Sequence, residues 1–389
     1  MRIRHVPVAI ALAVPLLVAP MAFAEDAAPS LDEREAVDVL GEAVTHLDEM
    51  PSLPESAMLS RDRDDASEDI DALMDEALEV LDLPGIREMR SRYRELEEEI
   101  AETRVELASL REARVFAKNG DPSMLAKFTP TDTLKQMTAT TRADYDELIE
   151  SKQSDIESLE TALAEERERL AEGLSEIGIE MDPDQLELWL SSVIGDDVMS
   201  MSVVFQSIRQ VTLRLEELTA ESGEDLAFAK RYYGMVVILH KLIVRMQETF
   251  IHRVDNEVLP KLDAYREEAD DIIAESRRLI REGGNRESLE RNIESNRLTQ
   301  EAIDLYERVV RDQRDKVAEA LEISRQERDV ATNTYRTVQL SSNVTSLIRE
   351  GADTFKTLSS LQVPATAAFK NEAMREEFRK LTERMTAGD

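Results

Sequence analysis

Three side chains in the second half of the chain have types and spacing that would suit a divalent cation. Glu248, His252 and Asp255 are four and three residues apart, so a helix would place them on one face. Carboxylate oxygens and an imidazole nitrogen are ligands that such a metal accepts. One helix rarely supplies three ligands to a closed site, however, and carboxylates commonly steady a neighbouring imidazole. We therefore predict no metal site and no cofactor here.

Other candidates for chemistry are equally weak. His240 lies in an apolar stretch, where we expect a buried, hydrogen-bonded core histidine rather than a pH-responsive switch. The acidic run that starts at Asp62 suggests a calcium loop, but Ser67 and Leu73 stand where that loop needs Gly and Glu, so we predict an acidic helix start. The sequence has no cysteine, no Gly-x-Ser-x-Gly motif and no phosphate-binding glycine loop. We predict a protein that is not an enzyme and has no catalytic residues.

The composition favours long helices as the elements that position these residues. Aromatic residues make up only 4% of the chain, and there are 12 glycines and 12 prolines among 389 residues. Sheets and barrels need frequent turns, whereas long helices bury narrow aliphatic stripes with few rings. The 82 acidic and 48 basic side chains give a net charge of −34, which repels nucleic acid and anionic lipid headgroups. We predict an elongated all-α protein that does not bind nucleic acid.

Residues 1–24 have the pattern of a secretory signal peptide. A basic start is followed by an apolar run and then by Ala22-Phe23-Ala24, a small-x-small cleavage site in front of Glu25. Three prolines in this stretch argue against an uncleaved membrane anchor. We predict a periplasmic or secreted protein that begins at Glu25 and has no integral membrane span after cleavage.

The next segment, residues 25–84, is predicted to be an acidic N-terminal arm. Amphipathic patterns over residues 31–50 and 66–83 predict two short helices, which Pro51 and Pro54 separate. We expect this arm to be loosely held.

Residues 85–181 are predicted to form an antiparallel coiled-coil hairpin. Apolar residues seven apart, with others three residues after each, make the a/d stripe of a coiled-coil helix. A second stripe runs from Tyr145 to Ile177, with Lys152 and Glu166 interrupting it. At a rise of 1.5 Å per residue, arms of about 33 residues are roughly 50 Å long. The residues of the first stripe are Ile86, Met89, Tyr93, Leu96, Ile100, Thr103, Leu107 and Leu110.

The loop of this hairpin, residues 119–141, is a candidate partner-binding tip. It carries five apolar side chains where two helices must turn, and exposed apolar side chains usually need a partner. The alternative is a small cap that folds back and closes the hairpin. The five residues are Met124, Leu125, Phe128, Leu134 and Met137.

Residues 182–389 are predicted to form a bundle of long helices. Residues 234–251 are apolar nearly all round, which indicates the middle of a bundle. Gly283-Gly284 marks a turn, and the helix after it should reach at least Tyr335. The Met-rich stretch 198–205 is expected to be core. A strict seven-residue repeat adds the stripe Val237, Val244, Ile251, Val258, Tyr265, Ile272 and Leu279.

Two known classes share part of this pattern. The α-hairpin adaptors of tripartite export systems also have an exported helical hairpin, but theirs interrupts β-rich domains that are not predicted here. Helical pore-forming toxins share the secreted all-helical build, but they bury a near-continuous apolar tongue. Here Asp196 and Asp197 break the apolar region around Val198.

The sequence therefore favours a non-enzymatic, exported coiled-coil scaffold or spacer that binds partner proteins in the cell envelope. The sequence does not identify those partners, and a second copy of the chain is one candidate through the coiled coil. The alternative is a secreted helical membrane-active protein of pore-forming type. Both functions rest on architecture, because the sequence contains no recognisable set of catalytic residues.

Overall fold

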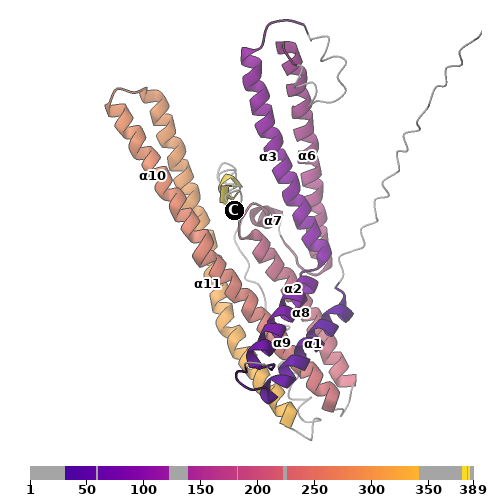
Figure 1. Ribbon diagram of the computed structural model, residues 1–389. Helices are drawn as coiled ribbons and strands as arrows, with labels where there is room; N and C mark the ends of the chain where they lie inside the picture. The colour runs from indigo at the N-terminus through magenta and orange to yellow at the C-terminus, as the bar shows by residue number, and fades with distance from the viewer. Residues whose placement is uncertain are drawn as a thin grey trace, which may run out of the picture.

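The computed structural model of the 389-residue chain describes residues 31–57, 60–121, 139–181, 183–221, 226–340, 379–382 and 384–385. Helices dominate these ranges and no β-strand occurs in them, which confirms the all-α prediction. Figure 1 shows two helical arms that rise from a common base. One arm is the α3–α6 hairpin, and the other is built from α10 and the first part of α11. The base contains α1, α2, α8, α9 and the second part of α11.

The first helices, α1 (Glu33–Glu49) and α2 (Arg63–Leu81), each begin at an aspartate cap. Asp32 accepts hydrogen bonds from the backbone N–H groups of Arg34 and Glu35. Asp62 and Asp65 form a reciprocal capping box at the start of α2. The acidic run at Asp62 is thus a helix start, as predicted. The short 3₁₀-helix η1 (Met50–Ser52) follows α1.

These two helices are not loosely held, so that part of the prediction is wrong. Leu40 of α1 and Ile70 of α2 are buried in the same apolar core as α8 and α9. Arg245 of α9 forms ion pairs with Asp71 and Asp75 of α2, at 2.9 and 2.8 Å. The two helices cover an apolar face of α9 that would otherwise meet water.

The α3–α6 hairpin consists of α3 (Pro84–Phe116) and α6 (Arg142–Glu176), which lie side by side. Its cross-pairs show that the helices are antiparallel, because residues late in α3 pair with residues early in α6. Arg114 bonds Asp146, Glu106 pairs with Lys152 at 2.8 Å, and Arg104 pairs with Glu160 at 2.9 Å. The predicted stripe faces the interior, since its four positions seven apart are all buried: Ile86, Tyr93, Ile100 and Leu107.

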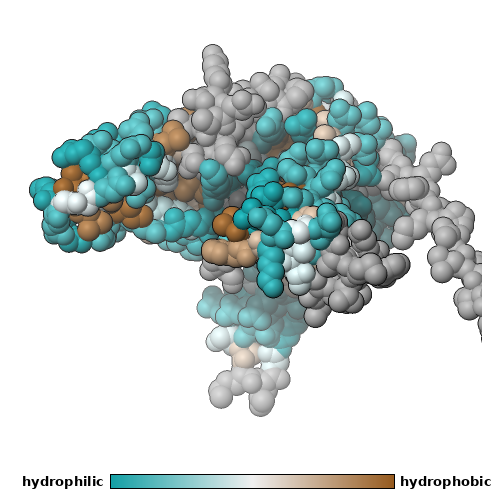
Figure 2. Space-filling view, turned by 90° about the horizontal axis from the view of Figure 1, so that it is seen from above, coloured by the Kyte–Doolittle hydropathy of each residue, from teal (hydrophilic) through white to brown (hydrophobic). Residues whose placement is uncertain are grey.

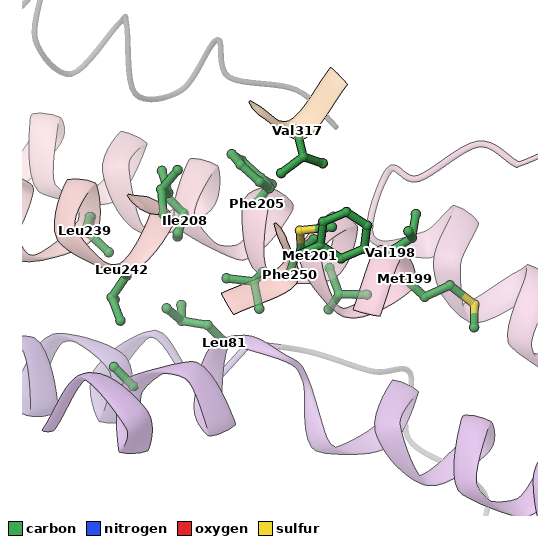
Figure 3. Close-up of a cluster of buried hydrophobic side chains, with 14 of the residues drawn as sticks. Leu81, Val198, Met199, Met201, Phe205, Ile208, Leu239, Leu242, Phe250 and Val317 are labelled. Carbon is green, nitrogen blue, oxygen red and sulfur yellow. The ribbon is translucent and has the colours of Figure 1, made fainter. Parts of the chain in front are cut away.

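The Met-rich stretch belongs to α8 (Gly195–Glu221), which follows the short α7 (Pro183–Leu190). Figure 3 shows Met201 and Phe205 of this stretch gathered with Phe250 of α9. Every one of these side chains is buried, so the stretch is core, as predicted. Gly195 permits the tight turn between the helices, because a Cβ there would lie 1.6 Å from the carbonyl oxygen of Trp189.

Two long helical rods make the rest of the molecule. The first comprises α9 (Leu226–Arg253), a π-helical turn η2 (Val254–Val258) and α10 (Leu259–Arg281) without a break. The second is α11 (Arg286–Leu340). Gly283 has a φ of +92°, and the Gly284 N–H donates to the carbonyl oxygen of Leu279, so the predicted glycine turn is confirmed. At 1.5 Å per residue each rod is roughly 80 Å long.

The π-helical turn corrects the predicted stripe beyond it. The seven-residue repeat places Ile272 on the buried face, but Ile272 is 41% exposed and Ile273 is buried instead. A π-turn holds one residue more than an α-helical turn. Each residue after it therefore lies where the preceding residue would lie in a regular α-helix. Pro260, which has no N–H to donate, is the second residue after this turn.

The most apolar segment is enclosed by the base. Residues 235–239 of α9 are all buried, and α1, α8 and α11 contact that helix. None of the helices in the described ranges is long and apolar enough to cross a membrane. The described end of the chain also contacts the folded helices, because Leu381 and Met385 are buried and Lys261 donates to the Met385 carbonyl at 3.2 Å.

Candidate functional site

The end of the α3–α6 hairpin carries the predicted partner-binding loop. The five apolar residues of that prediction fall within 122–138, outside the described residues. The structure describes the two chain segments that enter and leave this loop. Lys118 and Thr141 form an isolated β-bridge, and the Arg142 N–H donates to the Lys118 carbonyl at 2.9 Å. The loop is therefore closed at its base by backbone hydrogen bonds.

A buried carboxylate fixes the point where α6 begins. Asp144 accepts hydrogen bonds from the backbone N–H groups of Thr140 and Thr141, both at 3.0 Å. The Thr141 hydroxyl in turn accepts from the Asp144 N–H, which completes a capping box. Next to it, the hydrogen bond to Asp146 raises the pKa of Arg114 and ties α3 to α6. Both helix ends are thus fixed relative to each other.

Two large apolar side chains are exposed beside this clamp. Val115 is 64% exposed and Phe116 is 83% exposed, on the last turn of α3. Figure 2 looks onto the arm ends and shows apolar patches that interrupt a mainly hydrophilic face. Neither residue was predicted from the sequence. A signal was present, because the a/d positions of the stripe fall at 114 and 117, which leaves both side chains off the seam.

The three candidate metal ligands do not come together. Glu248 pairs with Arg325 at 2.7 Å, and Asp255 pairs with Arg314 at 2.8 Å. The ring of His252 lies 3.1 Å from the side-chain amide of Asn256. Across the described ranges no group of three metal-ligating side chains gathers. Each member of the triad instead has a partner of its own, and two of these partners join α9 and η2 to α11.

His240 is buried as expected, but the expected hydrogen bond is wrong. Its side chain is fully buried on α9, and neither ring nitrogen has a hydrogen-bond partner among the described residues. Burial lowers the pKa of this imidazole from 6.5 to about 4, because the charged form loses its hydration. The residue is therefore neutral in the folded protein at pH 7.

Comparison with known proteins adds no further constraint. No family model matches the chain, and neither a curated protein nor a solved structure gave a match.

Proposed function

We propose that this protein is a non-enzymatic, exported scaffold or spacer that binds partner proteins in the cell envelope. The observation that carries the proposal is the exposed pair Val115 and Phe116 at the end of a hairpin about 50 Å long. Exposed apolar clusters on a charged surface are typical of protein-binding sites. The end of an arm is also the place where a partner would be held farthest from the base.

The way the arms join the base supports a spacer. The second arm has no hinge at its root, since α9, η2 and α10 form one rod and α11 runs through both arm and base. Ion pairs also join the two rods, with Arg314 to Asp255 at 2.8 Å and Arg266 to Asp304 at 3.1 Å. The base is one continuous apolar core to which α1, α2, α8, α9 and α11 all contribute.

The proposal predicts that Leu125→Ser combined with Phe128→Ser abolishes co-purification of an envelope partner. If these loop residues contact a partner, helicity and melting temperature should stay nearly unchanged, because exposed side chains contribute little to folding. Pull-downs from the native envelope and thermal melts on the same variant measure both effects. Val115→Ser with Phe116→Ser should behave in the same way.

The control is Val105→Ser, which alters an equally exposed side chain farther down α3, at 70% exposure. It should retain all partners. A closing cap instead predicts a loss of about 2 to 4 kcal/mol in stability, with binding lost only through unfolding. A stable double variant that keeps every wild-type partner would contradict docking at the tip.

No observation favours the membrane-active alternative. Its most apolar segment, residues 234–251 of α9, lies in the core, so insertion would require the base to open. Lysis of liposomes by the intact protein would support this alternative over the scaffold.

A further inference from the structure

A groove of about 1060 Å³ opens on the base between η1, α2, α9 and the last turns of α11. Its volume is slightly above the range of about 300 to 1,000 Å³ that is typical of small-molecule sites. Four separate segments of the chain contribute to it.

The charge of this groove is opposite to that of the chain. Five cationic side chains line it, against three carboxylates, in a protein with a net charge of −34. A local excess of cations within an acidic protein attracts anions that the rest of the surface repels. The cations are Arg63, Lys241, Arg245, Arg328 and Arg336, and the carboxylates are Asp71, Glu248 and Asp329.

The three carboxylates are already engaged by arginines. Asp71 pairs with Arg245 at 2.9 Å, Asp329 pairs with Arg328 at 2.9 Å, and Glu248 pairs with Arg325, as described above. Arg63 donates from its Nε to two backbone carbonyl oxygens, at 3.2 and 3.1 Å. Two of the five cations that line this groove have no such partner, and they lie on α9 and α11.

Those two cations are Lys241 and Arg336. Neither forms a hydrogen bond or ion pair with a described residue. Lys241 is half-buried, and burial lowers the pKa of its amine; nearby Asp71 opposes this shift and nearby Arg328 adds to it. A half-buried ammonium group without a close counter-ion is costly, and a bound anion would relieve that cost.

The remaining wall of the groove is apolar. Met74, Val237 and Val244 are buried, and Leu47 and Met50 are partly buried beside them. A ligand that fills the groove would therefore place a hydrocarbon portion against this wall while its charged end meets the cations.

We propose that this groove binds a small amphipathic anion, a carboxylate or phosphate ester with an aliphatic tail, whose head group contacts Lys241 and Arg336. The tail lies against Met74, Val237 and Val244. This site is independent of the scaffold function, because it lies on the base and not at the hairpin end.

Isothermal titration calorimetry on the full chain tests the proposal with three probes that share one tail: octanoate, octyl phosphate and uncharged 1-octanol. We expect one site per chain for at least one of the anions, with an affinity at least tenfold higher than for 1-octanol. Comparison of the two anions distinguishes a carboxylate ligand from a phosphate ligand. Lys241→Met and Arg336→Met should each weaken anion binding about tenfold, the usual effect of losing one charged hydrogen bond.

The matched controls are Lys316→Met and Arg297→Met, which remove cations of α11 that do not line the groove. Both should bind like the wild type. Lys241→Met should also raise the melting temperature, because it removes a poorly hydrated charge. If neither anion binds, if 1-octanol binds equally well, or if folded Arg336→Met leaves the affinity unchanged, the proposal is overturned.

Discussion

Ile100→Asp is expected to lower the stability of the α3–α6 hairpin by about 3 kcal/mol or more, because it places a charge in a seam that excludes water. Ile100 is buried between α3 and α6. Native-state hydrogen exchange of the α3 amides measures the local effect, and a thermal melt measures the global one.

The control for this experiment is on the same helix. Glu98 is exposed two residues away, so Glu98→Asp should change stability by less than about 0.5 kcal/mol. Equal losses at the two positions would show that the buried stripe of the hairpin is misassigned.

The second prediction with a large effect concerns pH. Burial holds the pKa of His240 at about 4 in the folded protein, below its ordinary value of 6.5. Between these values the unfolded chain binds a proton that the folded chain does not, so stability falls as the pH falls. The contribution of His240 is complete above pH 6.5 and is lost toward pH 4. The difference between the two pKa values corresponds to about 3 kcal/mol of folding stability.

Urea unfolding at several pH values between 4 and 7 measures this dependence. His240→Phe keeps a ring of similar size in the core and removes the titrating group, so its stability should fall less steeply with acid. An unchanged pH dependence in His240→Phe would contradict a buried neutral imidazole.

Features that depend on neighbouring residues were predictable from the sequence. The seven-residue spacing of Ile86, Tyr93, Ile100 and Leu107 gives the buried face of α3, because one helix determines which residues share a side. The turn at Gly283 and Gly284 is also local, since a positive φ at a helix end favours glycine.

Features that depend on distant segments were not predictable in this way. The helices α1 and α2 have short amphipathic patterns like those of a loose arm, and only their contact with α9 shows that they belong to the core. The single-residue shift from Ile272 to Ile273 follows from a π-turn that propensities do not reveal. The groove with Lys241 and Arg336 exists only where four separate segments meet.

The candidate site was predictable in part. The sequence indicates an apolar tip for the hairpin, but the five residues it marks do not include Val115 and Phe116 at the end of α3. Their exposure depends on which face of α3 meets α6, and the cross-pair of Arg114 with Asp146 lies beside them at that end.

The most direct test of the scaffold account is a measurement of the distance between the two arms. The chain has no cysteine, so spin labels at Glu112→Cys on α3 and Glu287→Cys on α11 are unique. A control pair at Glu88→Cys and Glu112→Cys lies about 36 Å apart along one helix. This pair gives the width of the distance distribution that is expected of a rigid element. Pulsed electron–electron double resonance should show a single inter-arm distance with a distribution as narrow as this control. A broad or multi-peaked inter-arm distribution would contradict a protein that holds its partners at a fixed separation.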